Sequence, residues 1–351
     1  MLVEDDYNVD AWDRLDGIAD PRETKSLLGH DDALNFLAEK YSQNALHHAW
    51  LISGPRGIGK ATFAFRFAEH MLRHPDSRQA PNNFTLQDDT IHSQVSKGAH
   101  PNVMVLRRPW DQKTKKFKTT ISIDEVRKTI RFFTTSSGAN AWRICIVDPA
   151  DDLKASAANA LLKILEEPPA RTIFFVLAHS PRGLLPTIRS RCQSLNLKPL
   201  EEPKLSAIIN EQGITSKMNQ EEQDQLTALA KGSVRRAILL ANSKAVENYT
   251  NFLSNLKRPT PDIASLHRLA GSISLVSKAD EFQLFMDLIY DYLSDQLHDP
   301  KNIDDKNKLL HLSQVWEETI SSVQTMETWN MDKKQIILSL FNNMRATQTH
   351  S

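Results

Sequence analysis

The feature that most restricts the fold of this chain is a regular alternation of short apolar runs and amphipathic segments between residues 28 and 200. The apolar runs are rich in β-branched or aromatic residues and are bounded by polar or turn residues, as buried strands are. This alternation predicts a parallel β-sheet with crossover helices packed on its faces. The expected strands are residues 49–53 (AWLIS), 102–106 (NVMVL), 143–148 (RICIVD) and 172–178 (TIFFVLA).

The segments between these strands differ in kind. Residues 61–72, 123–133 and 155–169 carry apolar residues at helical spacing and are expected to be helices that pack on the sheet. Residues 74–99 are rich in polar residues and proline and are expected to form an irregular insertion. Residues 110–120 hold four lysines and are expected to form a hairpin tip, which we interpret as a solvated loop rather than a DNA contact.

After residue 200 the strand pattern stops and the periodicity is helical throughout. We therefore expect an α/β domain over residues 1–200, a small helical domain over residues 201–250 and an all-α domain over residues 251–351. Two apolar stripes in the last domain are interpreted as core or subunit interface. Their residues are Phe282, Phe285, Met286 and Ile289, and Ile337, Leu340, Phe341 and Met344.

The composition excludes several classes of protein. Lys plus Arg and Asp plus Glu both total 43, so no overall field favours non-specific binding to nucleic acid or an anionic membrane. Cys145 and Cys192 are the only cysteines, too few for a disulfide scaffold or a four-thiolate zinc site. The acidic N-terminus lacks the apolar core of a signal peptide, and no run is long enough to span a bilayer. We expect a soluble cytoplasmic protein.

Directly after the first expected strand, GPRGIGKAT fits the phosphate-loop pattern G-x-x-x-x-G-K-[ST] except at its last position. Such a loop directs backbone N–H groups at an anion beside a helix N-terminus, and its lysine neutralises the outer phosphates. Ala61 replaces the hydroxyl that binds magnesium, and Thr62 lies about 100° further round the helix. The predicted nucleotide-binding residues here are Gly54, Pro55, Arg56, Gly57, Ile58, Gly59, Lys60, Ala61 and Thr62.

The third expected strand ends in Asp148-Pro149, where an NTPase of this class carries Asp-Glu. Proline cannot orient or deprotonate a water molecule, so both positions that serve magnesium and hydrolysis are defective. Asp148 is assigned to the nucleotide site, although an ordinary acidic residue at a strand end explains it equally well. Asp151 and Asp152 are expected to cap the next helix rather than to replace the missing base.

Residues 158–195, from ANALLKILEEPP to LLPTIRSRCQSL, closely resemble the signature of bacterial clamp-loader subunits, the AAA+ proteins of the DNA polymerase III holoenzyme. Together with PRETKSLLGHDDALNFL, HHAWLISGPRGIGKAT and WRICIVDPADDLK they look most like the delta-prime group of that family. The similarity covers about residues 21–240. It implies an AAA+ P-loop domain, a helical lid and a C-terminal helical collar that holds the subunits together.

The resemblance also implies a function. Subunits of this group help to load the sliding clamp onto primed DNA, act as a stator and usually lack hydrolysis of their own. By position, Arg191 matches the arginine that reaches into the ATP site of a neighbouring motor subunit, and Arg235 matches the sensor-two arginine. The implied partners are the tau/gamma motor and delta subunits, with the clamp and DNA reached through the complex, and no membrane. Some relatives carry a zinc module where this chain has residues 74–99, and zinc is not expected here.

Two other functions remain as alternatives. A motor ATPase of the tau/gamma type would require a hydroxyl after Lys60 and a glutamate after Asp148, and this chain has neither. A dedicated single-stranded DNA binder would require an aromatic and basic platform, which the sequence does not show. For the phosphate loop two interpretations stay open, namely ATP binding without efficient hydrolysis and the loss of nucleotide binding, with magnesium doubtful in both.

Overall fold

The structure is a computed structural model that describes residues 12–15, 17–85, 87, 89–134, 141–303, 305–329 and 332–349. The chain forms two compact units, one of residues 1–213 with 231–235 and one of residues 214–230 with 236–351. The fold predicted from the sequence, an α/β domain followed by helical parts, is confirmed. The division of the chain at residues 200 and 250 stays a prediction.

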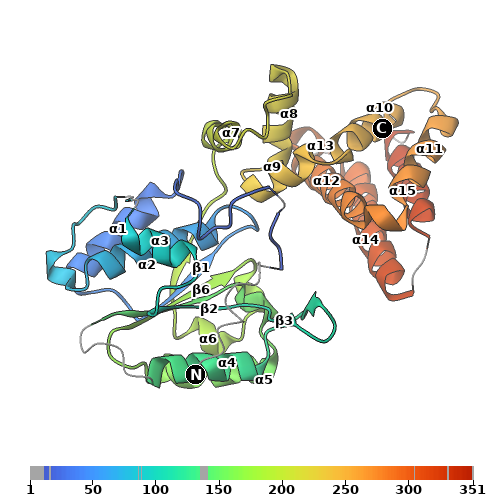
Figure 1. Ribbon diagram of the computed structural model, residues 1–351. Coiled ribbons are helices and arrows are strands. Elements are labelled where there is room, and N and C mark those ends of the chain that lie inside the picture. The colour runs from blue at the N-terminus through green and yellow to red at the C-terminus, as the bar shows by residue number, and fades with distance from the viewer. Residues whose placement is uncertain are drawn as a thin grey trace. The chain divides into compact units, whose positions relative to one another are not determined.

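A five-stranded parallel sheet lies at the centre of the first unit (Figure 1). Its order is β2 (Val103–Leu106), β5 (Arg143–Val147), β6 (Thr172–Ala178), β1 (Ala49–Ser53) and β7 (Gln193–Asn196). The four strands expected from the apolar runs are all present. Because the strands are parallel and in register, with Ser53 opposite Ala178 and Val147 opposite Val176, the residues that follow β1, β5 and β6 meet at one edge.

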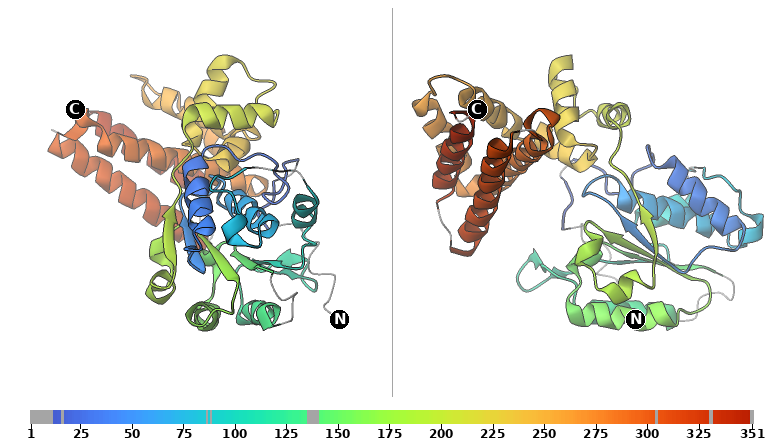
Figure 2. Two further views of the ribbon diagram at one scale, coloured as in Figure 1. Left: turned by 90° about the vertical axis from the view of Figure 1, so that its left-hand side faces the viewer. Right: turned by 180° about the vertical axis from the view of Figure 1, so that it is seen from behind.

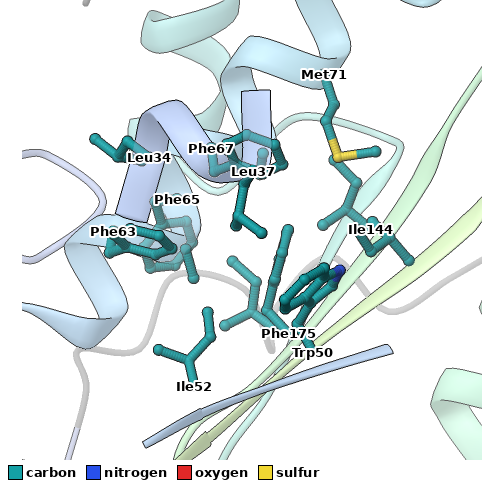
Figure 3. Close-up of a cluster of buried hydrophobic side chains, with 14 of the residues drawn as sticks. Leu34, Leu37, Trp50, Ile52, Phe63, Phe65, Phe67, Met71, Ile144 and Phe175 are labelled. Carbon is teal, nitrogen blue, oxygen red and sulfur yellow. The ribbon is translucent and has the colours of Figure 1, made fainter. Parts of the chain in front are cut away.

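Helices cover both faces of this sheet (Figure 1). On one face α1 (Asp31–Ser42) and α2 (Lys60–Arg73) bury an aromatic-rich core against Trp50 and Ile52 (Figure 3). On the other face α4 (Ile123–Thr134) and α5 (Ala155–Glu166) pack against Leu51 and its neighbours. Successive strand residues point to opposite faces, so one apolar strand contributes to both cores. Figure 3 shows Phe63, Phe67 and Phe175 among the side chains of the first core.

The remaining elements of this unit are short. The expected hairpin is formed by β3 (Trp110–Asp111) and β4 (Lys116–Phe117), which pair antiparallel. The short helix η3 (Ala150–Asp152) follows β5, and η4 (Pro181–Gly183) and α6 (Pro186–Arg189) lie between β6 and β7. The helix α7 (Glu202–Glu211) follows β7.

The expectation that residues 74–99 are irregular is wrong in part, because they contain η2 (Ser77–Gln79) and α3 (Thr90–Ser96). Buried polar groups hold α3 against α2: Glu69 forms an ion pair with Arg66 at 2.9 Å and contacts the His92 ring at 3.1 Å. The Asp89 side chain caps α3 by accepting the backbone N–H of His92. A helix of seven residues has no long apolar stripe, so the sequence pattern does not reveal it.

The second unit consists of helices in its described part. They are α8 (Gln220–Ala230), α9 (Val234–Ala241), α10 (Ala245–Leu256), α11 (Ile263–Ile273), η5 (Val276–Lys278), α12 (Ala279–His298), α13 (Pro300–Ile303), α14 (Lys306–Trp329) and α15 (Lys333–Thr349). The first two residues of α9 belong to the first unit. α14 and α15 pack side by side (Figure 2). The two apolar stripes predicted from the sequence lie on α12 and α15 and form part of one buried core with Phe252.

Candidate functional site

The phosphate loop connects β1 to α2 in a conformation that requires glycine. Gly54 and Gly57 have φ values of +148° and +79°, in a region that residues with a side chain rarely adopt. A Cβ atom on Gly54 would lie 2.4 Å from the carbonyl oxygen of Leu197, and one on Gly57 would lie 2.4 Å from the Cβ of Arg235. The loop therefore lies in close contact with Leu197 on one side and with Ser233 and Arg235 on the other.

Lys60 begins α2, and its ammonium group is fully engaged within the chain. Nζ donates hydrogen bonds to the carbonyl oxygens of Gly54 and Pro55, both at 2.7 Å, and lies 3.0 Å from Nδ1 of His179. Burial lowers the pKa of Lys60 to about 8, against the opposing effect of Asp148. An ammonium group has three donors, so a phosphate that enters the loop must replace at least one of these bonds.

His179 follows β6 and was not identified from the sequence. Burial and the charge of Lys60 lower its pKa to about 4, so the ring is neutral at pH 7 and Nδ1 accepts from Lys60. One signal was available, because polar residues that follow neighbouring parallel strands gather at one edge of the sheet, where open α/β sheets bind ligands.

Asp148 follows β5 at the same edge. Its pKa is raised to about 7, first by burial and then by the negative charge of Asp13, while Lys60 and Arg107 oppose the shift. The carboxyl group is therefore close to its titration midpoint at neutral pH, unlike a metal-binding carboxylate that stays ionised. Pro149 is the next residue and has no group that accepts a proton.

The expectation that Asp151 and Asp152 cap the next helix is wrong. Asp151 accepts the backbone N–H groups of His179 at 2.8 Å and Ser180 at 3.1 Å. Asp152 forms a bidentate pair with Arg108, at 2.5 and 2.6 Å. The N-cap of α5 is Lys154, whose side chain makes no capping bond. The two carboxylates thus stabilise the loops around the site. Their hydrogen bonds to distant partners replace the local hydrogen bond to the helix N-terminus, because these partners bind the carboxylates more strongly.

The segment that contains Arg235 packs on the phosphate loop, which brings two of the predicted site regions together. Ser233 Oγ donates a hydrogen bond to the carbonyl oxygen of Arg56 at 2.8 Å. The backbone N–H of Arg235 donates one to the carbonyl oxygen of Gly57 at 3.3 Å. The Arg235 guanidinium donates to the backbone carbonyl of Asp13. Burial lowers the pKa of Arg235, which Asp13 opposes.

Two N-terminal residues lie among the arginines of this site, and sequence analysis missed both. The Trp12 ring is 3.8 Å from the guanidinium carbon of Arg108 and 5.0 Å from that of Arg56. The Asp13 carboxylate lies 3.7 Å from Arg56 and 3.9 Å from Arg235. No periodicity or motif indicates these contacts, since they join residues more than 40 positions apart in the chain.

Arg191 lies outside this cluster. It follows α6, its side chain is 34% exposed, and its Nη2 forms an ion pair with Oε1 of Glu166 at 2.5 Å. Nη1 donates to the carbonyl oxygen of Thr187 at 3.0 Å. These partners belong to α5 and α6 and not to the phosphate loop, so the structure does not bring Arg191 together with the other predicted site residues.

Within the described residues, no group of three or more His, Cys, Asp and Glu side chains is arranged to hold a metal ion. Cys145 and Cys192 are buried, and burial raises the pKa of both thiols. No helix in the described ranges has the length and apolar character needed to cross a membrane.

Known proteins of the DNA polymerase III clamp-loader group are similar to this chain. The family described as DNA polymerase III, delta subunit, matches residues 29–201. The delta' subunit of DNA polymerase III from Pseudomonas aeruginosa is 27% identical over 304 residues, which are 85% of this chain and 88% of that protein. The delta' subunit from Escherichia coli is 32% identical over 167 residues, 47% of each chain.

Relatives with other names also match. The DNA polymerase III gamma subunit of Buchnera aphidicola subsp. Schizaphis graminum is 28% identical over 68% of this chain and 62% of that one. A solved structure of a gamma subunit-related protein from Thermotoga maritima aligns with a TM-score of 0.43 and 16% identity, over 90% of this chain and 98% of that chain. The family match and the delta' relatives agree with the phosphate loop and the sheet edge described above, and over 85% of its length the chain is similar to a delta' subunit of DNA polymerase III.

Proposed function

We propose that this chain is the stator of a clamp loader, which hydrolyses little or no ATP itself and supplies Arg191 to the ATP site of a neighbouring motor subunit. Its partners are then subunits of the tau/gamma and delta types, and through the complex it acts on the sliding clamp and primed DNA. The delta' and gamma names of its relatives support these partners.

The observation that carries the proposal is the chemistry of the chain's own site. Magnesium in such sites requires oxygen ligands, and Ala61 offers a methyl group directly after Lys60. Thr62, the next hydroxyl, is only 9% exposed and packs into the domain. The position after Asp148 is a proline, so no carboxylate is available there to orient a water molecule. A bound nucleotide would thus lack both the metal ligand and the base.

Arg191 has the properties of a group that acts on another subunit. Its guanidinium is a permanently charged planar fork, which matches phosphate oxygens better than a lysine does. It is partly exposed and its ion pair with Glu166, itself 47% exposed, is of the surface type that contributes little stability. Exchanging Glu166 for a γ-phosphate therefore costs little.

The experiment is to assemble the complex with Arg191→Ala or Arg191→Lys and to measure ATP hydrolysis stimulated by clamp and DNA, together with clamp loading. Loss of an arginine supplied in trans lowers hydrolysis at the affected site by on the order of a thousandfold. The bulk rate falls only in part because the other sites keep their arginines. Arg189→Ala, an exposed arginine two residues away, is the matched control. Unchanged hydrolysis and loading in both Arg191 variants would leave the residue structural.

The alternative is a motor ATPase, which the similarity to gamma and tau subunits favours. The isolated chain distinguishes the two. A stator shows negligible turnover, whereas a motor shows magnesium-dependent turnover that Lys60→Ala abolishes. Observation of that turnover would replace the stator proposal.

A further inference from the structure

The Trp12–Asp13 pair lies beside the phosphate loop. Three arginines surround it: Arg56 of the phosphate loop, Arg235 in the first turn of α9 and Arg108 after β2. Arg56 contacts both residues, Arg235 contacts Asp13, and Arg108 contacts Trp12. The contacts lie within the first unit. The chain therefore places its own anion and its own aromatic ring beside its phosphate loop.

We propose that Trp12 and Asp13 form an intramolecular occupant of the nucleotide site, which competes with a nucleoside triphosphate for the cations around the phosphate loop. The proposal rests on the proposed function in one respect, the assignment of this loop as the nucleotide site. It adds a regulation of that site by the chain's own N-terminal segment.

The chemistry of the two side chains matches the parts of the ligand they exclude. A carboxylate beside Arg56 and Arg235 uses the guanidinium groups that would otherwise face phosphate oxygens. Asp13 is also near enough to Asp148 to help raise the pKa of that carboxyl. The segment thus both neutralises cations and adds negative charge at the site, and both effects oppose the binding of a polyanion.

Trp12 supplies the aromatic part. Its indole packs on the guanidinium groups of Arg108 and Arg56, and a fused two-ring system on a guanidinium plane is the arrangement that a purine base also adopts on arginine. Arg108 is held in place by its bidentate pair with Asp152, so this platform persists when the indole leaves.

The segment is held weakly enough to be displaced. Both ion-pair distances of the Asp13 side chain are longer than a hydrogen bond, and that side chain is 37% exposed. The hydrogen bond from the Arg235 guanidinium goes to the backbone carbonyl of Asp13 and is therefore common to the original chain and to variants of the Asp13 side chain. Exposed ion pairs and cation–π contacts of this kind favour the state in which the segment occupies the site over the open state by roughly a factor of ten. The site is then open in about one molecule in ten, and the apparent affinity for nucleotide is lowered about tenfold in proportion to that fraction.

The test uses the full chain and a fluorescent analogue of ATP, N-methylanthraniloyl-ATP, titrated with and without Mg²⁺. The double variant Trp12→Ala with Asp13→Asn should bind the analogue about ten times more tightly than the original chain. Adding Lys60→Ala to the double variant should remove the gain, because the gained binding is at the phosphate loop. Asp13→Asn alone preserves the packing and should give a smaller gain, roughly threefold.

Asp124→Asn is the matched control, since Asp124 is a 74% exposed carboxylate that pairs with Arg127 on α4, and it should leave the affinity unchanged. Double and single variants that bind no more tightly than the original chain would overturn the proposal, as would a gain that survives Lys60→Ala. Either result leaves the role of Arg191 intact, because that role is measured by hydrolysis in the assembled complex.

Discussion

Replacing Gly57 by alanine should destabilise the first unit through two separable effects. Gly57 has a φ of +79°, and a Cβ atom there would lie 2.4 Å from the Cβ of Arg235 and 2.5 Å from Oγ of Ser233. Gly213, in the same unit, has a nearly equal φ of +71° but nothing within 4 Å of an added Cβ. The pair of variants therefore separates the cost of the backbone conformation from the cost of the contact.

The backbone cost is common to both variants and amounts to about 1–2 kcal/mol. The contact cost belongs to Gly57→Ala alone. The nearest obstacles are the Cβ atom of Arg235 and the Ser233 hydroxyl, which is hydrogen-bonded to the Arg56 carbonyl, and neither is the end of a long flexible side chain. The segment of residues 233–235 must therefore move, which adds about 1–3 kcal/mol. We expect a total of roughly 2–5 kcal/mol for Gly57→Ala and only the backbone part for Gly213→Ala.

Differential scanning calorimetry of the full chain measures the difference, because it can resolve the transition of each unit. For a unit of this size, 1 kcal/mol lowers Tm by about 2–4 °C. Gly57→Ala should lower the Tm of the first unit by several degrees more than Gly213→Ala and leave the second unit unchanged. Equal losses in the two variants would refute the argument that residues 233–235 pack tightly on the phosphate loop.

Two further predictions concern charge and packing. Asp148→Asn should raise the Tm of the first unit at pH 8, and this advantage should disappear as the pH falls from about 7 towards 4. The pKa of the Asp148 carboxyl in the folded state is raised to about 7, so its ionised form destabilises the fold. The original chain therefore loses stability as the pH rises through this range, whereas the variant does not. An advantage that persists at pH 4 would show that the effect is not ionisation. Phe285→Ala should lower the stability of the second unit by about 3–5 kcal/mol, since the side chain is fully buried against Phe252, whereas Leu275→Ala at a 53% exposed position should change it by less than about 0.5 kcal/mol in urea unfolding.

The elements of the fold were largely predictable because they follow from local pattern. Short β-branched runs such as residues 172–178 become strands wherever both faces are covered, and the apolar stripe with Phe285 becomes core wherever a partner helix exists. The helix α3 could not be predicted, because it does not follow from local pattern. Its stability comes from the buried contacts of Glu69 and His92, which no local pattern encodes.

The features of the site likewise fall into those that the sequence determines and those that depend on distant contacts. The identity of the phosphate loop, the missing hydroxyl at Ala61 and the missing base at Pro149 are properties of single positions, and the sequence determines them without reference to any contact. The roles of Asp151 and Asp152 were predicted wrongly, because local capping competes with partners that are distant in the chain.

Tertiary structure alone decided which charges share the loop. His179 meets Lys60 because β1 and β6 are parallel neighbours in register, and Asp13 meets Arg56 and Arg235 because three separate segments converge at the edge of the sheet. Electrostatic interactions depend on distance through space and on burial, neither of which can be read from positions along a chain. The sequence thus specifies a phosphate loop without its catalytic partners, and only the folded chain shows that its lysine and arginines are already engaged by the protein itself.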